Sequence, residues 1–172
     1  MKKVIVSIVI IFFLNINSFG HVEHYQKFNS LEYELFRNNK TIGFHNYNFI
    51  RNDNNLIVDS EVSFKITKLG VDLYKYYAQS KETYLNGIFT GFTSKTNQNK
   101  KQKYVNISID PLDKNLLIDG SSYKGKADKD VIIGTWWNHE IVKKKAQISA
   151  VSGRIIRQNV TFIGKEKIKI GE

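Results

Sequence analysis

Residues 133–142 carry the side chains best suited to chemistry. This stretch holds both tryptophans of the chain, Trp136 and Trp137, followed directly by Asn138, His139 and Glu140. A histidine can act as a general base when an acid orients its ring. His139 is therefore the one candidate for a catalytic residue, and it would make the protein a hydrolase.

Two readings of His139 remain open. Neighbouring residues do not face one another on a helix, so Glu140 is not expected to orient the ring of His139. The plain alternative is a histidine that satisfies a hydrogen bond beside packed tryptophans. The chain has 0 cysteines, which excludes thiol nucleophiles and thiolate metal sites. We therefore assign no catalytic residue from the sequence.

A row of aromatic side chains suggests binding rather than catalysis. Residues 71–85 alternate as a strand, which places Tyr74, Tyr76, Glu82 and Tyr84 on one face. Such a row either lines a concave surface or packs as core. The candidate ligand-binding residues are Tyr74, Tyr76, Trp136, Trp137, Asn138 and His139.

The remaining histidines offer little metal chemistry. His21 and His24 flank Glu23, but no third ligand accompanies them, and zinc sites need three or four protein ligands. We expect no metal site and no cofactor.

The amino terminus has the three parts of a secretory signal peptide. Lys2 and Lys3 precede an apolar run of about 11 residues, and Ser18-Phe19-Gly20 places small residues before the expected cleavage point. That run is well short of the roughly 20 residues needed to span a bilayer. We expect a signal peptide at 1–20, a single domain at 21–172, no transmembrane segment after its removal, and a periplasmic protein.

The formal charge of +10 indicates an affinity for anionic partners. Lysines cluster at residues 100–103, 143–145 and 165–169, either as a solvated surface or as a contact for lipid head groups and acidic envelope polymers. Export argues against nucleic acid as the partner. The oligomeric state cannot be inferred.

Apolar and polar residues alternate along much of the chain, as expected of an all-β protein. Residues 56–68 place Leu56, Val58, Val62, Phe64 and Ile66 on one face, as expected of an antiparallel sheet with one face in water. Asn86-Gly87 predicts a tight hairpin, and Gly43 predicts a bulge or a close contact. The expected fold is a strongly curled antiparallel meander, an open half-barrel.

The carboxyl-terminal third is expected to add one crossover and more strands. Asp130 could cap a short helix near Val131, so the Trp-Trp segment is predicted to be helical or irregular. Strands are predicted at 146–150, 154–163 and 166–170. The last run still alternates where the sequence stops, so we expect that the domain is C-terminally incomplete.

Five blocks of sequence support a family resemblance. They are residues 31–33, 68–71, 98–101, 118–125 (IDGSSYKG) and 134–139 (GTWWNH). These blocks resemble a family of exported bacterial proteins of unknown function, whose layout is similar to periplasmic curled-sheet proteins. The resemblance implies a periplasmic setting and an open sheet, and it supplies no catalytic or binding residues.

The function expected from these features is a non-enzymatic module that binds an apolar or amphipathic envelope molecule of the lipid or lipoprotein type. Two alternatives remain. One is a hydrolase that acts on an envelope polymer through His139, and the other is a structural component of an envelope complex.

Overall fold

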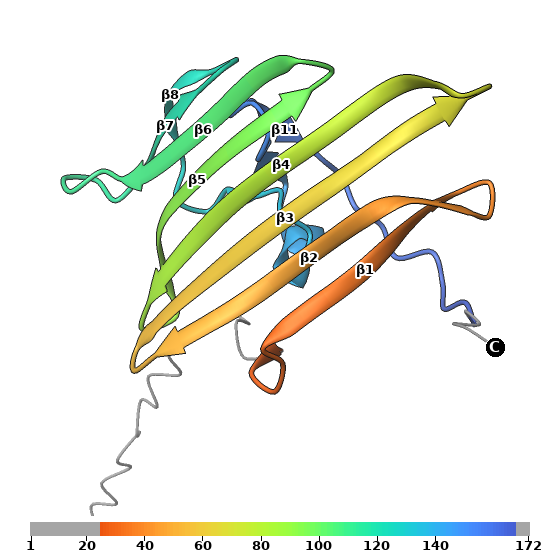
Figure 1. Cartoon of the computed structure of the whole chain (residues 1–172). Coiled ribbons are helices and arrows are strands. Elements are labelled where there is room, and N and C mark those ends of the chain that lie inside the picture. The colour runs from red at the N-terminus through yellow and green to blue at the C-terminus, as the bar shows by residue number, and fades with distance from the viewer. Residues whose placement is uncertain (1–24, 168–172) are drawn as a thin grey trace, which may run out of the picture.

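A computed structural model describes residues 25–167, which form one large sheet and one small sheet (Figure 1). The large sheet has eight antiparallel strands in the order of the chain, so each strand pairs with the next. The strands are β1 (Ser30–Arg37), β2 (Lys40–Asn52), β3 (Asn55–Lys68), β4 (Val71–Leu85), β5 (Ile88–Gln98), β6 (Lys101–Ile109), β7 (Leu116–Gly120) and β8 (Lys124–Ala127). Among the described strands, β1 and β8 do not pair, so the sheet stays open. The predicted all-β, curled, antiparallel meander is therefore confirmed.

Tight turns join the long strands. Asn86 and Gly87 both adopt positive φ, 51° and 73°, which is the backbone of a type I′ hairpin turn. Asn38 and Asn39 do the same between β1 and β2, with φ of 51° and 58°. Because asparagine and glycine tolerate this conformation, the hairpins form locally and fix the register of the pairs they join.

A small sheet packs on the concave face of the large one. It has the order β11-β10-β9, with β9 (Ile132–Ile133), β10 (Ala146–Ile148) and β11 (Ile155–Arg157). Ile133 and Ile148 join a core cluster with side chains from β5 to β8, among them Phe92 and Val105. This half of the concave face is therefore covered by the chain itself.

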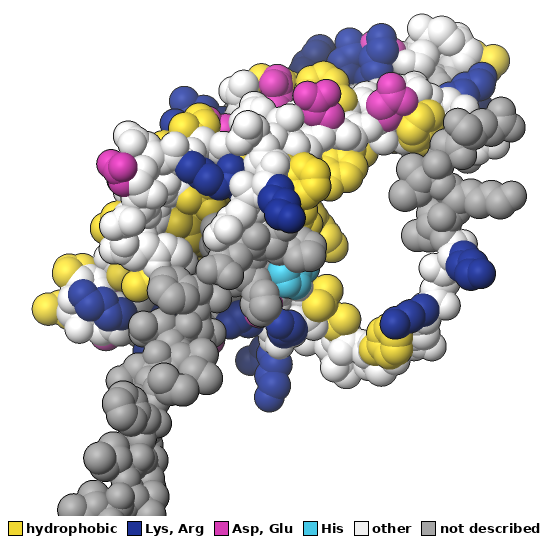
Figure 2. Space-filling view, turned by 90° about the horizontal axis from the view of Figure 1, so that it is seen from below, with side chains coloured by type: hydrophobic (Ala, Val, Ile, Leu, Met, Phe, Trp, Pro, Cys, Tyr) yellow, Lys and Arg dark blue, Asp and Glu magenta, His cyan; other side chains and the backbone are white. Residues whose placement is uncertain are grey.

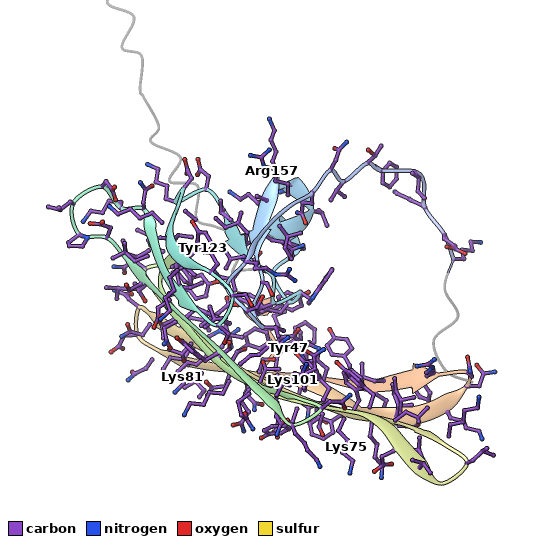
Figure 3. All side chains as sticks on the ribbon, turned by 90° about the horizontal axis from the view of Figure 1, so that it is seen from above. Tyr47, Lys75, Lys81, Lys101, Tyr123 and Arg157 are labelled. Carbon is purple, nitrogen blue, oxygen red and sulfur yellow. The ribbon has the colours of Figure 1, made fainter. Side chains whose placement is uncertain are left out.

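A second core cluster lies under the other half of the sheet. Trp137 packs against Phe49 and Tyr84, with ring centroids 5.6 and 5.9 Å away and the rings nearly perpendicular. Tyr47, Leu56 and Val58 complete the buried part of this cluster. Figure 3 shows Tyr47 on the side of the sheet that faces the small sheet, while Lys81 lies on the other side. One indole thus provides much of the bulk over which β2 to β4 curl.

The segment after β9 differs from the predicted short helix near Val131. β9 occupies that place, and a 3-10 helix, η2 (His139–Lys143), follows the tryptophans. The Asn138 side chain accepts a hydrogen bond from the Glu140 backbone N–H and so caps η2. The prediction of a helical or irregular Trp-Trp crossover is confirmed, but Asn138 rather than Asp130 provides the cap.

The carboxyl-terminal strands are shorter than predicted. β11 covers Ile155–Arg157, and no strand follows it as far as residue 167. The predicted strand at 154–163 is therefore mostly wrong, and the one at 166–170 lies largely outside the described residues. In this part the apolar side chains have no sheet neighbour to pack against: Phe162 and Ile163 are exposed. Figure 2 shows the molecule hollowed between this segment and the sheet, with hydrophobic side chains on the wall of the opening.

Candidate functional site

The concave face is built from aligned rows of side chains that run across the strands. One row joins His45, Val62, Ala78 and Thr96 by register, from β2 to β5. The next row, toward the end of the strands, joins Phe64 and Tyr76. Residues of both rows line a cavity of about 330 Å³ beside the small sheet.

Aromatic rings form the apolar end of the cavity floor. Phe64 stacks on Tyr76 with ring centroids 5.0 Å apart and 21° between the planes. Phe64 also stacks on Tyr74, at 5.8 Å and 26°. Three rings held by mutual contact give a pre-formed apolar surface, which loses little conformational entropy when a ligand binds.

The wall of the cavity comes from residues 134–136 and from Ala150 and Val151. Hydrogen bonds to backbone groups of the wall attach it to both sheets. The Gly134 N–H donates to the Ile148 carbonyl at 2.9 Å, and the Ser94 hydroxyl donates to the Ala150 carbonyl at 2.5 Å. The Tyr47 hydroxyl donates to the Thr135 carbonyl at 2.5 Å. The wall is therefore held at fixed points on β2 and β5.

A buried carboxyl lies behind this wall. Glu82 is only 2% exposed and lies, by register, between Val58 and Phe92 of the two core clusters. The Thr135 hydroxyl donates to its Oε1, and the Tyr84 hydroxyl donates to its Oε2 at 2.6 Å. Glu82 thus links the large sheet to the segment that forms the cavity wall.

Burial governs the protonation of this network. Removal from water raises the pKa of Glu82, and the hydrogen bonds from Thr135 and Tyr84 and the nearby indole N–H of Trp137 only partly oppose it. Burial, together with the charge of Glu82, also raises the pKa of Tyr84 and of Tyr47. Both phenols therefore act as hydrogen-bond donors at neutral pH.

The cavity floor is uncharged at neutral pH. Burial lowers the pKa of His45, whose Nε2 lies 3.1 Å from the Ser60 hydroxyl. A neutral imidazole among Val62, Phe64 and Ala78 favours an apolar occupant.

The predicted ligand-binding residues divide into two groups. Tyr74, Tyr76 and Trp136 line the cavity, and Trp136 is 72% exposed. Trp137 is 3% exposed and lies in the core, and Asn138 caps η2. The structure therefore brings three of the six candidates together, and their binding role stays a prediction.

His139 also lies apart from the cavity, at the start of η2. Its Nε2 is 3.6 Å from Glu140 Oε1, which is beyond hydrogen-bond distance, and Lys143 Nζ contacts the same oxygen at 2.8 Å. The two residues are nevertheless closer than expected for neighbours on a helix. His139 lines none of the three cavities described here.

Two other cavities are less suited to an apolar ligand. One of about 520 Å³ lies on the convex face and is lined by polar and charged side chains such as Lys81 and Lys95. The other, of about 900 Å³, shares Phe64 and Tyr76 but extends over an ion pair between Lys75 and Asp72 at 2.9 Å. The 330 Å³ cavity is the one in which aromatic side chains meet a fixed wall.

Sequence reasoning missed three parts of the site. Phe64 was assigned to the correct face of its strand but not to a binding surface. Between Tyr74 and Tyr84, Glu82 is the one charged residue on a period-two face that otherwise carries tyrosine, alanine and serine, which is a signal for a buried carboxyl. Thr135 had no such signal, because its contact with Glu82 joins residues that are 53 positions apart.

Comparison with known proteins identifies a family and no individual relative. A family model described as "Domain of unknown function (DUF6134)" matches residues 33–172. The chain belongs to the DUF6134 family. The DUF6134 match covers β2 to β11 and every residue of the cavity. Comparisons with curated proteins and with solved structures found no match.

Two further properties concern the described residues. Among residues 25–167, no helix is long and apolar enough to span a bilayer. In the same residues, no group of three or more histidine, aspartate or glutamate side chains is arranged to hold a metal ion. His21, Glu23 and His24 lie outside the described residues.

Proposed function

We propose that this DUF6134 protein is a non-enzymatic binding module that holds an apolar or amphipathic envelope molecule on its concave face. The observation that carries the proposal is the 330 Å³ cavity, with a floor of stacked Phe64, Tyr74 and Tyr76 and a wall that contains Trp136. Its volume falls at the lower end of the roughly 300–1,000 Å³ typical of small-molecule sites.

The polar groups at this site support binding better than chemistry. The hydroxyls of Ser94 and Tyr47 are used to hold the wall, and those of Thr135 and Tyr84 are used by Glu82. One hydroxyl–base pair does line the cavity, Ser60 with Nε2 of His45 at 3.1 Å, but no aspartate or glutamate among residues 25–167 bonds to His45 to orient its ring. The Thr135 hydroxyl contacts the Glu82 carboxyl, which is 2% exposed and lies behind the wall. A pre-formed pocket whose Ser94 and Thr135 hydroxyls are already used in structural hydrogen bonds is suited to retaining a ligand unchanged.

The proposed setting is the periplasm. Support comes from the sequence of residues 1–20, which lie outside the described part of the chain. Cell fractionation with amino-terminal sequencing of the processed protein tests this part. A chain that starts at His21 in the periplasmic fraction is the expected result, and an unprocessed cytoplasmic chain would contradict it.

The binding proposal is tested with N-phenyl-1-naphthylamine, a neutral probe that fluoresces in apolar surroundings. Ala78 lies on the cavity floor between Val62 and Thr96. Replacement of Ala78 by Phe should fill the cavity and weaken probe binding by at least about tenfold, equivalent to about 1.4 kcal/mol.

The matched control is Thr93→Phe, which places the same ring on the exposed convex face of β5. This variant should bind the probe as the wild type does. If the wild type binds no probe, or if both variants bind it equally well, the concave cavity is not a binding site.

Neither alternative function is favoured by an observation at the site. A hydrolase would need His139 beside a cleft, and His139 lines none of the described cavities. A structural role in an envelope complex does not require a pre-formed aromatic pocket.

A further inference from the structure

One lysine on the concave face differs from the paired lysines of the surface. Lys103 of β6 is half-buried and faces Thr96, a fully buried residue of the cavity floor, across the β5–β6 pair. Its Nζ donates to Gln98 Oε1 at 2.6 Å. No aspartate or glutamate between residues 25 and 167 lies within ion-pair distance of it.

Several other lysines of the sheet have acidic partners, and those without one among the described residues are exposed, namely Lys40, Lys68, Lys95 and Lys101. Lys124 contacts Asp119 at 2.8 Å, and Lys126 contacts Asp110 at 2.5 Å. A cation that is half removed from water and lacks a counter-ion is costly to keep in that position. A bound anion would supply the missing partner.

Hydrogen bonds connect this ammonium group to the cavity. Gln98 accepts from Lys103 and donates from its Nε2 to the Tyr74 hydroxyl at 2.6 Å. Tyr74 lines the cavity and stacks on Phe64. The polarity of the concave face therefore changes across the strands. Aromatic rings lie on β3 and β4, and an amide and an ammonium group lie on β5 and β6.

We propose that the ligand is an amphiphile with an anionic head group, whose apolar part lies on Phe64 and Tyr76 and whose head contacts Lys103. This inference rests on the proposed binding function and specifies the ligand class. Charge complementarity supports it, because the aromatic floor accepts a hydrocarbon chain and the one half-buried cation beside it accepts a carboxylate or phosphate oxygen. A neutral or cationic amphiphile leaves Lys103 without a counter-ion.

The test is displacement of N-phenyl-1-naphthylamine from the purified protein by amphiphiles of equal chain length below their micelle concentrations. Decanoate, decyl phosphate and decanol separate the two head-group chemistries from a neutral head. The anionic compounds should displace the probe at about tenfold lower concentration than decanol, as expected for one hydrogen bond to a charged group.

Two variants locate the charge. Lys103→Gln keeps a donor for Gln98 and should remove the preference for anions, while displacement by decanol stays unchanged. Lys95→Gln makes the same change of charge on the exposed convex face of β5 and should preserve the preference. Thermal unfolding of each variant, followed by circular dichroism, shows whether the fold is retained.

The outcomes separate this inference from the proposed function. If the probe binds but the wild type does not distinguish decanoate or decyl phosphate from decanol, the anionic head is wrong and the binding function stands. If inorganic phosphate alone displaces the probe, the site recognises an anion without its chain, which also overturns the inference. If no probe binds, the binding function itself fails, and this inference fails with it.

Discussion

The Tyr84 hydroxyl donates a 2.6 Å hydrogen bond to Oε2 of Glu82, two residues away on the same face of β4. Thr135 donates to the other oxygen of this carboxyl, from the segment that crosses the concave face. A carboxyl that is 2% exposed therefore lies where the sheet meets the wall of the cavity. The polar contact specifies the position of that segment, which apolar packing alone would leave less defined.

The first prediction is that stability decreases as Glu82 ionises. Burial raises the pKa of Glu82 above its usual 4.5, so the folded state holds this proton more tightly than the unfolded chain does. The stability linked to Glu82 is complete below about pH 4.5 and is lost as the pH rises through the folded-state pKa. The amide side chain of Glu82→Gln stays neutral at every pH. The free energy of unfolding of this variant, relative to that of the wild type, should therefore increase with pH. The total increase is about 1.4 kcal/mol for each unit by which folding raises the pKa of Glu82.

Urea unfolding of both chains between about pH 4 and pH 9 measures this difference. His45 acts in the opposite sense, because burial lowers its pKa and its contribution rises with pH up to about 6.5. That contribution is common to both chains and cancels in the difference. Parallel stability curves would show that Glu82 is ionised in the folded protein as readily as in the unfolded one.

The second prediction concerns the donor from the cavity wall. Thr135→Val keeps the shape of the side chain and removes the hydroxyl that donates to Glu82 Oε1. The expected loss in the free energy of unfolding is about 1–3 kcal/mol, the cost of an unsatisfied buried acceptor. The loss should be larger at alkaline pH, where the carboxylate is charged.

A double-mutant cycle with Glu82→Gln shows whether the two residues act together. A coupling energy of at least about 0.5 kcal/mol is expected for groups in one hydrogen-bond network. Thr93→Val, on the exposed face of β5, is the control and should change stability little. Additive effects of Thr135→Val and Glu82→Gln would show that the hydroxyl stabilises something other than the carboxyl.

The third prediction concerns a close approach of two strands. A Cβ at Gly43 would collide with the carbonyl oxygen of Ser63 and would lie 2.6 Å from Cα of Phe64 on the paired strand β3. Gly43→Ala should therefore cost about 1–3 kcal/mol, because backbone has to move. The control is Gly70→Ala, where nothing lies within 4 Å of the new Cβ, although the φ of 77° adds its own smaller strain. Equal stability losses in urea unfolding would contradict the collision.

The fold followed from the sequence because its main signals are local. Period-two alternation placed Val58 and Phe64 on one face of their strand, and a glycine in an apolar strand indicated a bulge or a close contact at Gly43, of which the close contact is present. The strands at 146–150 and 154–163 were predicted too long because the alternation continues past Ile148 and Arg157, where the described residues provide no pairing strand. Local pattern cannot show whether a pairing partner exists.

The site followed from the sequence only in part. Tyr74 and Tyr76 share a face by periodicity, so their place on one surface could be predicted. The division between Trp136 and Trp137 could not, since it depends on the backbone conformation at Trp136. With the φ of Trp136 at 70°, one indole points outward and the next one inward. A tryptophan in the sequence does not indicate a left-handed backbone conformation.

The fourth prediction is that the two adjacent tryptophans differ in what they stabilise. Trp137 is 3% exposed and packs against Phe49, Tyr84 and Tyr25. Trp137→Ala should cost about 3–5 kcal/mol in the free energy of unfolding, as large aromatic truncations in a core do.

Trp136 is 72% exposed and has a left-handed backbone, which costs a non-glycine residue roughly 1 kcal/mol. Trp136→Gly should therefore leave stability unchanged or raise it by up to about 1 kcal/mol. The same substitution removes an indole from the cavity wall and should weaken binding of the naphthylamine probe. A large stability loss in Trp136→Gly, with probe binding intact, would assign this indole to the core instead of the binding surface. The pair therefore separates stability from binding at two consecutive positions of the chain.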